Sequence, residues 1–381
     1  MNSLRPTWAE IDLSAIAHNI EALRRITRPG VRMMTVIKAN AYGHGTVEVA
    51  KACAQSGVDF LGVALQGEAC QLRANRIDTP ILVLGYTPAV GALTTVLNGF
   101  RQTVFDVDSV QALSRAAAET GKNAFIHVKI DTGMSRIGFQ PDEAGLQTVA
   151  GFFETPGIVV EGMFTHMAAA DTSNPDYTNR QLEQFDRFLA RLAARGYSVP
   201  IRHAANSASL IQYPQAQYDM VRAGIAVYGL RPSDEVDISE LGLIPAMRLM
   251  SRVVMVKELP PGTPVSYGCT FVTQRPTRVA TAPVGYGDGY TRLYSSRVFA
   301  SIRGRRVPLI GRVCMDQCMF DVTDLEEVKV GDEVVLFGRP EDGVMADDLA
   351  SAIGTINYEV VCLINSRVPR IYVHRAENGS Q

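Results

Sequence analysis

Lys38 is the residue of this sequence whose position first suggests chemistry. It is the one lysine of the stretch VIKANAYGHG, where an apolar run ends and glycines begin. Its amine has three possible roles: a surface charge, a partner in an ion pair, or a nucleophile directed into a pocket. The first two are the commoner roles of a lysine at the end of a strand. The third requires burial or cationic neighbours that lower the pKa of the amine.

Other polar side chains follow apolar runs further along the chain. A single histidine is more often a satisfied core residue, and a single arginine is more often a salt-bridge donor. Here several runs end in basic groups, and a cationic rim of this kind suits an anionic ligand. The residues concerned are Lys38, then His127, Lys129, Asp131 and Arg136, then Thr165 and His166, then His203, Asn206 and Ser207, and finally Arg222 and Gly224.

A phosphate group is the anion that these stretches suit best. The stretch RAGIAVYG, which begins at Arg222 and includes Gly224 and Ile225, offers backbone N–H groups to a phosphate. The turn NSAS, which begins at Asn206, adds hydroxyl groups. A phosphate site together with a nucleophilic lysine indicates pyridoxal phosphate as the cofactor.

These residues need a fold that brings strand ends together. From Met33 to Leu230, short β-branched runs alternate with helical patterns, which is typical of repeated βα units with a parallel sheet. No GxGxxG follows the first run, so a dinucleotide-binding sheet is disfavoured. A closed (β/α)8 barrel, with its active site at the C-terminal ends of the strands, fits better. Its eight predicted strands are MMTVIK at 33, DFLGVA at 59, ILVLG at 81, QTVF at 102, FIHVKI at 125, IVVEGMFTH at 158, IRHAA at 201 and YDMVRAGIAVYG at 218.

The pattern changes between Pro232 and Pro245. Beyond it, short strands are separated by Pro/Gly turns, which predicts a second, mainly β domain. We therefore expect a barrel over residues 12–240 and a mainly β domain over 241–381. Residues 1–11 precede the first barrel helix, and we expect them to join the β domain.

The predicted β domain has its own clusters of polar and aromatic residues. Tyrosine beside glycine usually marks a turn, but four such clusters exceed what turns alone would require. They contain Tyr267 in VSYGCTF, Tyr286 and Arg292 in PVGYGDGYTR, Met315 and Asp316 in GRVCMDQCMFD, and Tyr358 in INYEVVC.

Composition excludes several classes of protein. The chain has 381 residues, 46% of them hydrophobic, which is enough for a sizeable core. With 37 basic and 39 acidic residues and no basic run, a nucleic-acid partner is not expected. We find no membrane span and no signal-peptide pattern, so we expect a cytoplasmic protein. The six cysteines are scattered, and although Cys314 and Cys318 are close in sequence, no second pair completes a zinc site; no metal is expected.

Nine motifs in order make the chain resemble bacterial alanine racemases, pyridoxal-phosphate enzymes with a barrel followed by a β domain. The resemblance covers nearly the whole sequence, and the family works as a homodimer. It therefore implies interconversion of L- and D-alanine, supplying D-alanine for peptidoglycan. The motifs are VIKANAYGHG, KIDTGMSRIGF, FTHMAAAD, HAANSAS, DMVRAGIAVYGL, VSYGCTF, PVGYGDGY, GRVCMDQCM and NYEVVCLINSRVPR.

The resemblance also implies a role for each site residue. Lys38 would hold the cofactor covalently and act as one base, and Tyr267 of the partner subunit would be the opposite base. Arg222 would face the pyridine nitrogen. The remaining expected roles are phosphate or cofactor binding by Tyr42, His166, Asn206, Ser207, Gly224, Ile225 and Tyr358, carboxylate binding by Arg136 and Met315, and support by Lys129, Tyr286, Arg292 and Asp316, with Lys129 carbamylated as in many relatives.

This chemistry explains why such residue types are needed. Racemisation removes the α-proton on one face and returns a proton on the other, so two acid/base groups are required. A free tyrosine has a pKa of about 10 and is a poor base, so we expect positive charge from His166 and Arg292 to favour its phenolate. Arg222, with a side-chain pKa above about 12, would keep the pyridine nitrogen unprotonated and limit transamination.

Three alternatives remain open at this level. One is a racemase of the same build that acts on serine or a wider range of amino acids. Another is a decarboxylase of diamino acids, although a carboxylate clamped by Arg136 and Met315 would argue against it. The third is a non-catalytic pyridoxal-phosphate carrier, which would consist of the barrel alone and lack Tyr267.

Overall fold

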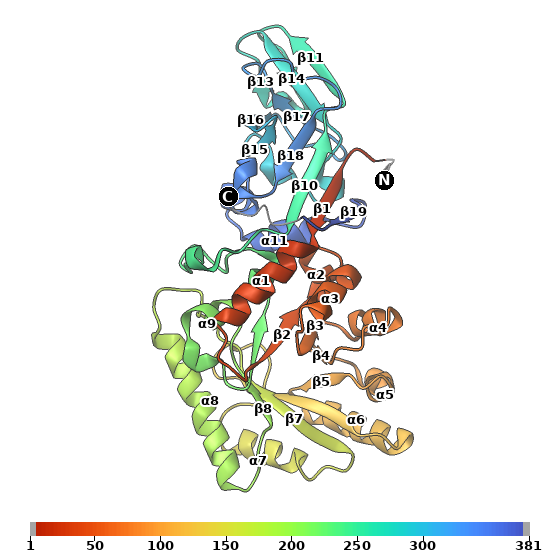
Figure 1. The fold of residues 1–381 in the computed structure, drawn as a ribbon, viewed down its shortest axis with the longest axis vertical. Coiled ribbons are helices and arrows are strands. Elements are labelled where there is room, and N and C mark those ends of the chain that lie inside the picture. The colour runs from red at the N-terminus through yellow and green to blue at the C-terminus, as the bar shows by residue number, and fades with distance from the viewer. Residues whose placement is uncertain (1–4, 376–381) are drawn as a thin grey trace. The chain divides into compact units, whose positions relative to one another are not determined.

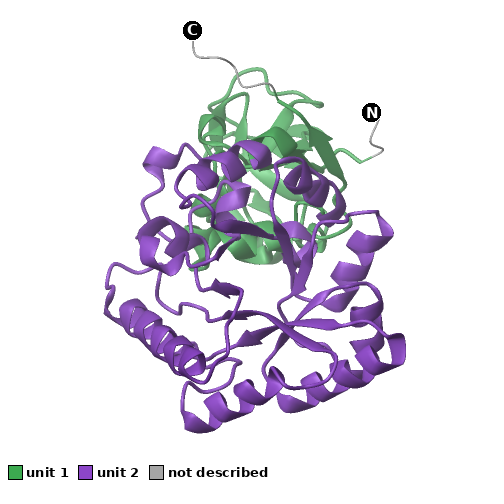
Figure 2. Ribbon diagram, turned by 60° about the horizontal axis from the view of Figure 1, so that its bottom comes forward, with its two compact units in different colours: residues 1–15, 42–45, 244–381 green, residues 16–41, 46–243 purple. Residues whose placement is uncertain are grey.

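The computed structural model describes residues 5–375, which fall into two compact units. Figure 2 shows them in purple and green. The barrel unit (purple) comprises residues 16–41 and 46–243. The described residues of the β unit (green) are 5–15, 42–45 and 244–375. The short segment 42–45, which directly follows the region of Lys38, thus packs within the β unit rather than the barrel unit.

The barrel unit contains an eight-stranded parallel sheet in the order β8-β7-β6-β5-β4-β3-β2-β9. Most of these strands are labelled in Figure 1. Backbone hydrogen bonds from Asp219 N to Arg202 O and from Arg222 N to Ala205 O, both 3.0 Å, join its two ends into a ring. The predicted barrel is confirmed. Its strands are β2 (Arg32–Val36), β3 (Phe60–Val63), β4 (Ile81–Val83), β5 (Arg101–Val104), β6 (Ala124–Lys129), β7 (Ile158–Phe164), β8 (Ile201–His203) and β9 (Met220–Ala223).

Helices follow the strands and bury one face each. In α8 (Asp176–Ala194) the buried Leu182, Phe185 and Leu192 recur at helical spacing, while charged residues occupy the other face. Each such side chain contributes roughly 1.5–3 kcal/mol when it leaves water. The other helices are α1 (Leu13–Arg25), α3 (Thr46–Gln55), α4 (Gln66–Ala74), α5 (Ala92–Leu97), α6 (Val107–Thr120), α7 (Glu143–Phe152) and α9 (Ser207–Gln212), with 3₁₀ turns η1 (Ala89–Gly91), η2 (Pro214–Ala216), η3 (Ile225–Tyr228) and η4 (Ser239–Leu241).

The β unit is built on a nine-stranded sheet in the order β11-β14-β17-β16-β15-β18-β10-β1-β19. Strand β1 pairs antiparallel with β10 and parallel with β19, so the opening segment is an inner strand of this sheet. The sheet strands are β1 (Trp8–Asp12), β10 (Met247–Arg252), β11 (Met255–Leu259), β14 (Thr277–Ala282), β15 (Phe299–Ile302), β16 (Arg305–Ile310), β17 (Cys318–Asp321), β18 (Glu333–Phe337) and β19 (Arg370–Val373). The hairpin β12 (Pro264–Val265) and β13 (Phe271–Val272), the 3₁₀ turns η5 (Tyr267–Cys269), η6 (Tyr286–Asp288), η7 (Arg292–Tyr294) and η8 (Pro340–Asp342), and the helices α10 (Ala346–Ile353) and α11 (Asn357–Leu363) complete the unit.

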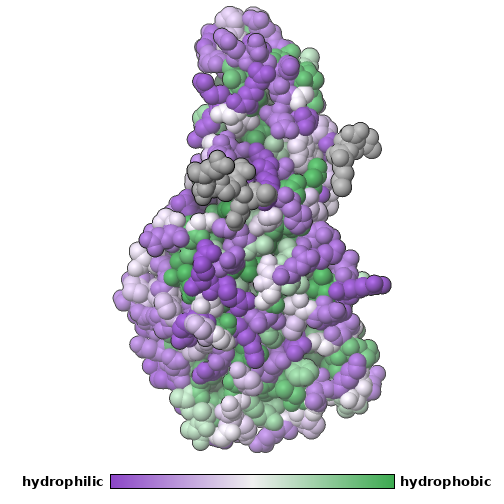
Figure 3. All heavy atoms as spheres, in the orientation of Figure 1, coloured by the Kyte–Doolittle hydropathy of each residue, from purple (hydrophilic) through white to green (hydrophobic). Residues whose placement is uncertain are grey.

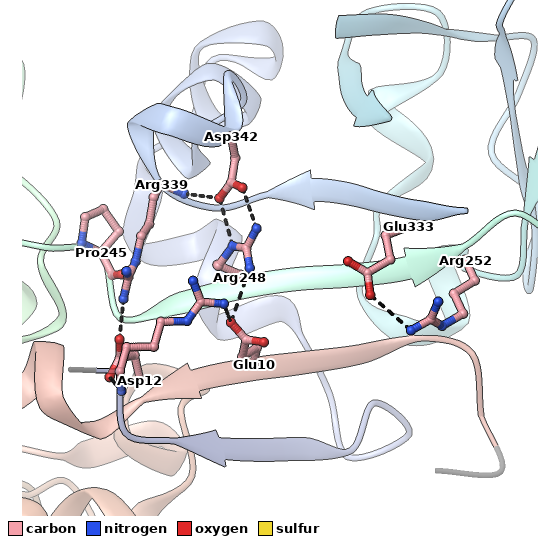
Figure 4. Close-up of polar contacts among 9 residues, drawn as sticks. Glu10, Asp12, Pro245, Arg248, Arg252, Glu333, Arg339 and Asp342 are labelled. Carbon is pink, nitrogen blue, oxygen red and sulfur yellow. Dashed lines mark hydrogen bonds and ion pairs between the residues drawn. The ribbon is translucent and has the colours of Figure 1, made fainter. Parts of the chain in front are cut away.

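Arginine side chains anchor β1 within this sheet (Figure 4). Arg248 on β10 binds both carboxylate oxygens of Asp342, at 2.8 and 2.5 Å, and also contacts Glu10 on β1 at 3.3 Å. Arg339 donates a hydrogen bond to Asp12 at the end of β1. These pairs are largely shielded from water, so they are screened less than surface pairs. They join the opening strand to residues more than 200 positions away in sequence.

Hydrophilic residues are spread over the face drawn in Figure 3, with hydrophobic residues scattered among them. Such scattering is normal for a globular surface. None of the helices in residues 5–375 combines the length and apolar character that crossing a membrane would require.

Candidate active site

Lys38 begins an unusual turn. Strand β2 ends at Val36, two residues before the lysine, and not at the lysine itself as expected from the sequence. The segment labelled α2 (Lys38–Tyr42) is not a right-handed helix, because Ala39, Asn40, Ala41 and Tyr42 all have φ between 51° and 55°. The left-handed conformation costs roughly 1–2 kcal/mol per residue. Strain of this kind persists only where the surroundings enforce it, and it is concentrated at functional sites.

Two side chains enforce this turn. The Glu68 carboxylate accepts a hydrogen bond from Ala39 N at 2.6 Å and two more from Ala64 N and Leu65 N at 2.8 and 3.1 Å. Asn40 Oδ1 accepts bonds from the backbone and hydroxyl of Thr46 at 3.1 and 3.3 Å. The Lys38 side chain is exposed at the C-terminal end of the barrel strands. Besides burial, the charge of Lys38 contributes to the lowered pKa of His166, so the amine lies close to the barrel site.

Arg222, on β9, is a buried cation without a counter-ion. It is 3% exposed, and no carboxylate in residues 5–375 forms an ion pair with it. Its guanidinium donates to Thr165 O at 3.0 Å, Ala204 O at 2.9 Å and His203 Nδ1 at 3.0 Å. Burial lowers the pKa of Arg222 to about 9. An uncompensated buried charge is costly, which suits a site that receives a polar or anionic ligand.

His166 is a neutral acceptor beside Arg222. Its Nδ1 lies 3.2 Å from the Arg222 guanidinium, which can only donate. Burial, followed by the charges of Arg222, Lys129 and Arg136, holds the pKa of His166 well below its ordinary value. The sequence led us to expect a positive charge here, but the neighbouring cations disfavour it.

Lys129, at the end of β6, is almost fully buried. Its Nζ donates to Ile130 O at 3.0 Å and lies 5.4 Å from the centre of the Phe164 ring. Burial and the charge of Arg222 lower the pKa of the Lys129 amine to about 7. A substantial fraction of the amine is therefore uncharged at neutral pH. The exposed Arg136 lies in the loop that follows Lys129 and makes no hydrogen bond or ion pair within residues 5–375.

Ser207 has one hydrogen-bonding capacity still to satisfy. Its buried Oγ accepts bonds from Gly224 N at 2.8 Å and Ala226 N at 3.4 Å. Both lone pairs are thus used, and the hydroxyl proton has no acceptor within the described chain. Gly224 N thus supports Ser207, and its role in phosphate binding stays a prediction. Ile225 begins the next turn, and Asn206 caps α9 by accepting from Ser209 N at 2.9 Å.

In the β unit, Tyr267 and Met315 line the same surface cavity of about 430 Å³, together with Ser266, Cys314, Asp316 and Gln317. The side chains of Tyr267 and Met315 are 66% and 53% exposed. Ser266 at φ 67° and Gly268 at φ 73° flank the tyrosine, and Ser266 Oγ donates to Arg312 O at 2.6 Å. Two residues 48 positions apart are thus presented to solvent on one face of this unit.

A glycine turn holds the Met315 loop in place. Tyr286 N and Gly287 N donate to Cys314 O and Met315 O at 3.1 and 2.8 Å. A Cβ atom on Gly285 would lie 2.2 Å from Cys314 O, so only glycine permits this approach. The half-exposed Tyr286 lies on this turn, and Asp316 is paired with Arg367 at 2.6 Å.

The remaining predicted residues of the β unit lie in two places. Tyr42 and Tyr358 are neighbours, with ring centres 6.2 Å apart. Burial raises the pKa of the Tyr42 phenol, so this group stays protonated and can donate. Arg292 is exposed at the start of η7.

Sequence reasoning gave no role to four residues that shape the barrel site. His127 and His203 were recognised only as strand-end residues, and Glu68 and Glu161 not at all. A carboxylate within the otherwise apolar run IVVEGMF is a signal that could have identified Glu161, since an unpaired charge is rarely placed in a strand of this kind.

Comparisons with known proteins cover both units. Residues 11–232 match the family model "Alanine racemase, N-terminal domain", and residues 246–372 match "Alanine racemase, C-terminal domain". The chain is 46% identical over 370 residues to an alanine racemase of Methanococcus maripaludis, covering 97% of this chain and 99% of that protein. It is 48% identical over 374 residues to an alanine racemase of Desulfovibrio desulfuricans, covering 97% and 98%. The structure of an alanine racemase from Clostridium difficile 630 matches with a TM-score of 0.94 and 41% identity, over 98% of this chain and 97% of that one.

Proposed function

Because the chain belongs to the alanine racemase family, we propose that it is an isomerase that interconverts L-alanine and D-alanine with pyridoxal phosphate as cofactor. The observation that carries this proposal is the match over both units, which includes Lys38 in one and Tyr267 in the other. A cofactor carrier made of the barrel alone would not need the second unit.

The residues of the barrel unit fit a phosphorylated pyridine aldehyde. Ser207 holds a buried hydroxyl proton without an acceptor, which suits a phosphate oxygen. Arg222 holds a buried N–H donor set without a counter-ion, which suits the pyridine nitrogen. Tyr42 and Tyr358 of the β unit, together with Asn206, Gly224 and Ile225, are proposed to complete the binding of the cofactor. When bound, pyridoxal phosphate would delocalise the electron pair left on the α-carbon after proton loss.

Two residues of the chain would move the α-proton. Lys38 Nζ would exchange it on one face and Tyr267 Oη of the partner subunit on the other. The left-handed turn after Lys38 would hold the amine in place, and the Ser266–Gly268 turn would do the same for the phenol. Because His166 is neutral, Arg222 and Arg292 are the cations proposed to favour the phenolate.

The substrate carboxylate is proposed to bind Arg136 and Met315. Lys129 would support Arg136 after carbamylation, since only an uncharged amine adds carbon dioxide and the pKa of Lys129 is lowered to about 7. The carbamate would bring a negative charge among Arg136 and Arg222. Tyr286 and Asp316 are proposed to hold the Met315 loop.

We further propose that the chain acts as a homodimer in the cytoplasm and supplies D-alanine for peptidoglycan. The exposure of Tyr267 and Met315 supports the dimer, because both could then reach the pocket of the partner subunit. Serine or other small amino acids are the substrates to test against alanine.

The test is incubation of the purified chain, loaded with pyridoxal phosphate, with each of a panel of L- and D-amino acids. Chiral chromatography should show inversion of alanine in both directions, and incorporation of solvent deuterium at the α-carbon should accompany it. A Lys38→Ala variant should be inactive, whereas Lys51→Ala, an exposed lysine of α3, should be as active as the parent chain. Loss of carbon dioxide from a diamino acid instead of inversion would reject the proposal.

A further inference from the structure

Behind Arg222, a line of hydrogen bonds crosses the barrel to the edge of β5. Arg222 Nη1 contacts His203 Nδ1 at 3.0 Å, and His203 Nε2 contacts His127 Nδ1 at 2.8 Å. His127 Nε2 then contacts Glu161 Oε2 at 3.1 Å, and Arg101 binds both oxygens of Glu161 at 2.9 and 3.0 Å. Both histidines are fully buried. The five residues come from β9, β8, β6, β7 and β5, so all belong to one rigid sheet.

The donors along this line determine where each proton must lie. Arginine only donates, so His203 Nδ1 must accept and its proton must be on Nε2. That proton is donated to His127 Nδ1, which leaves the proton of His127 on Nε2, directed at Glu161. The carboxylate accepts it, as an ionised carboxylate must. Each histidine is therefore neutral, and only one order of protons satisfies every bond.

The backbone of β6 and β7 accommodates the side chains that form this line of hydrogen bonds. The register of β6 and β7 shifts between Ile126 and His127, because Val160 pairs with Ile126 and Gly162 with His127. Glu161 is the extra residue at this bulge, and a bulge re-aims the side chain it carries. A Cβ atom on Gly162 would lie 2.3 Å from His127 Nδ1, so the glycine makes room for the ring. Phe164 stacks on His203 at 4.6 Å with the planes 7° apart.

We infer that Glu161 is a positioning residue for Arg222, acting through His127 and His203. The negative charge of Glu161 requires a donor, so the proton of His127 lies on Nε2. His127 Nδ1 then accepts the proton of His203 Nε2. His203 Nδ1 is left without a proton and is the acceptor that Arg222 meets. With the reverse order, the Nδ1 proton of His203 would face the N–H groups of Arg222, and two donors would be opposed. This inference rests on the proposed function, in which Arg222 meets the pyridine nitrogen of the cofactor.

The burial of the line is consistent with this order. Burial would raise the pKa of Glu161, but hydrogen bonds from His127 and Arg101 lower it to about 2. Burial lowers the pKa of His127. Burial, followed by the charge of Arg222, holds the pKa of His203 well below its ordinary value. The line thus contains one anion, Glu161, and two cations, with Arg222 on one side of the two histidine rings and Arg101 on the other.

The direct test is the protonation of each ring nitrogen in the cofactor-free chain, measured by long-range ¹H–¹⁵N NMR with ¹⁵N-labelled histidine. His127→Gln and His203→Gln variants assign the signals. We expect both histidines to carry a proton on Nε2 alone from pH 6 to pH 9. A proton on Nδ1 of either ring in the parent chain would overturn the inference, whether or not the chain proves to be a racemase.

A Glu161→Gln variant tests the role of the carboxylate. Arg101 can only donate, so it should take the amide oxygen and leave the amide NH₂ facing His127 Nε2. His127 and His203 should then change to the Nδ1 tautomer, and Arg222 should lose its bond to His203. We expect the Kd for pyridoxal phosphate to rise by roughly 10- to 100-fold, by analogy with the loss of metal affinity when the outer partner of a metal-binding histidine is removed.

Glu143→Gln is the matched control, because Glu143 also pairs with arginines in the barrel unit but touches no histidine. It should leave the tautomers and the Kd unchanged. If Glu161→Gln also leaves both unchanged, the carboxylate is not a positioning residue. If that variant does not fold, the tautomers of the parent chain still test the order of protons that the inference requires.

Discussion

At the scale of single residues, the barrel site is defined by which basic groups carry a charge. Arg222 is cationic and has no counter-ion among residues 5–375, His166 is neutral, and Lys129 has a pKa lowered to about 7. Three basic residues that look alike in the sequence thus differ in charge, because burial and mutual repulsion act on each to a different extent. The consequence can be measured for Lys129.

Lys129→Met should stabilise the chain most at low pH. The amine has an ordinary pKa of 10.5 and a folded-state pKa of about 7, so the unfolded chain binds the proton more readily between these values. Stability of the parent chain should therefore rise with pH across this window. Below pH 7 the full penalty is on the order of 4–5 kcal/mol, since one pKa unit is about 1.4 kcal/mol.

The measurement is urea unfolding at pH 6, 8 and 10 in buffer free of bicarbonate. The advantage of Lys129→Met over the parent chain should shrink towards zero by pH 10. Lys122→Met, which removes an exposed lysine, should show no such trend. A difference that is the same at every pH would mean that the Lys129 amine is not desolvated.

Tyr267→Phe should slow racemisation in both directions, because inversion needs both bases, but it should affect α-proton exchange from the two enantiomers unequally. The phenol is proposed to act on one face and Lys38 on the other, so removal of its oxygen should abolish exchange on one face only. We expect loss of about 10²–10⁴-fold in L-alanine turnover, the usual range for an acid/base group. Tyr197→Phe, in the loop between α8 and β8, is the control, and wash-in of deuterium from each enantiomer is the measurement. Equal and mild losses of deuterium wash-in from both enantiomers would contradict a two-base mechanism.

At the scale of elements, both candidate bases lie on strained turns rather than on strands or helices. Four residues after Lys38 are left-handed, and Ser266 and Cys269 on either side of Tyr267 have φ values of 67° and 50°. Such turns expose a side chain in a fixed direction, and the strain must be balanced by other bonds. For Lys38, the Glu68 carboxylate is the main restraint.

Glu68→Gln should loosen the turn. The carboxylate accepts three backbone N–H groups, and an amide would direct an NH₂ group at one of them. We expect a loss of about 1 kcal/mol in the free energy of unfolding, the net contribution of a typical hydrogen bond, since these donors are exposed or partly buried. Hydrogen exchange at Ala39 should also become faster. Glu48→Gln, at a half-exposed residue of α3, should change neither, and unchanged exchange in Glu68→Gln would place the restraint elsewhere.

At the scale of the whole molecule, the two candidate bases belong to different units of the chain. The resemblance predicts that each site takes Lys38 from one chain and Tyr267 from the partner subunit. Mixing inactive Lys38→Ala and Tyr267→Ala chains should then restore activity, because a heterodimer would contain one intact site. Random pairing makes half of the dimers heterodimers, and each heterodimer has one intact site of two. Up to about a quarter of the parent activity is therefore expected.

The control is each variant mixed with itself, which should remain inactive. Formation of heterodimers is checked with two different affinity tags. Demonstrated heterodimers without activity would favour a site built within one chain.

The sequence by itself determined the barrel, the β domain that follows it and the family. Local patterns suffice for these, because alternating apolar runs and helical spacing act over a few residues, and the nine motifs keep their order. It also identified His127 and His203 as strand-end residues. The domain limits at 240 and the role of each site residue stay predictions.

Only the tertiary structure decided how the basic residues differ. The left-handed turn after Lys38 depends on Glu68, 29 positions away in the chain, and the proton order behind Arg222 depends on two histidines that are 76 positions apart. Charge state and tautomer follow from burial and from the nearest donor or acceptor. Neither property is contained in local sequence, because both arise where distant strands meet.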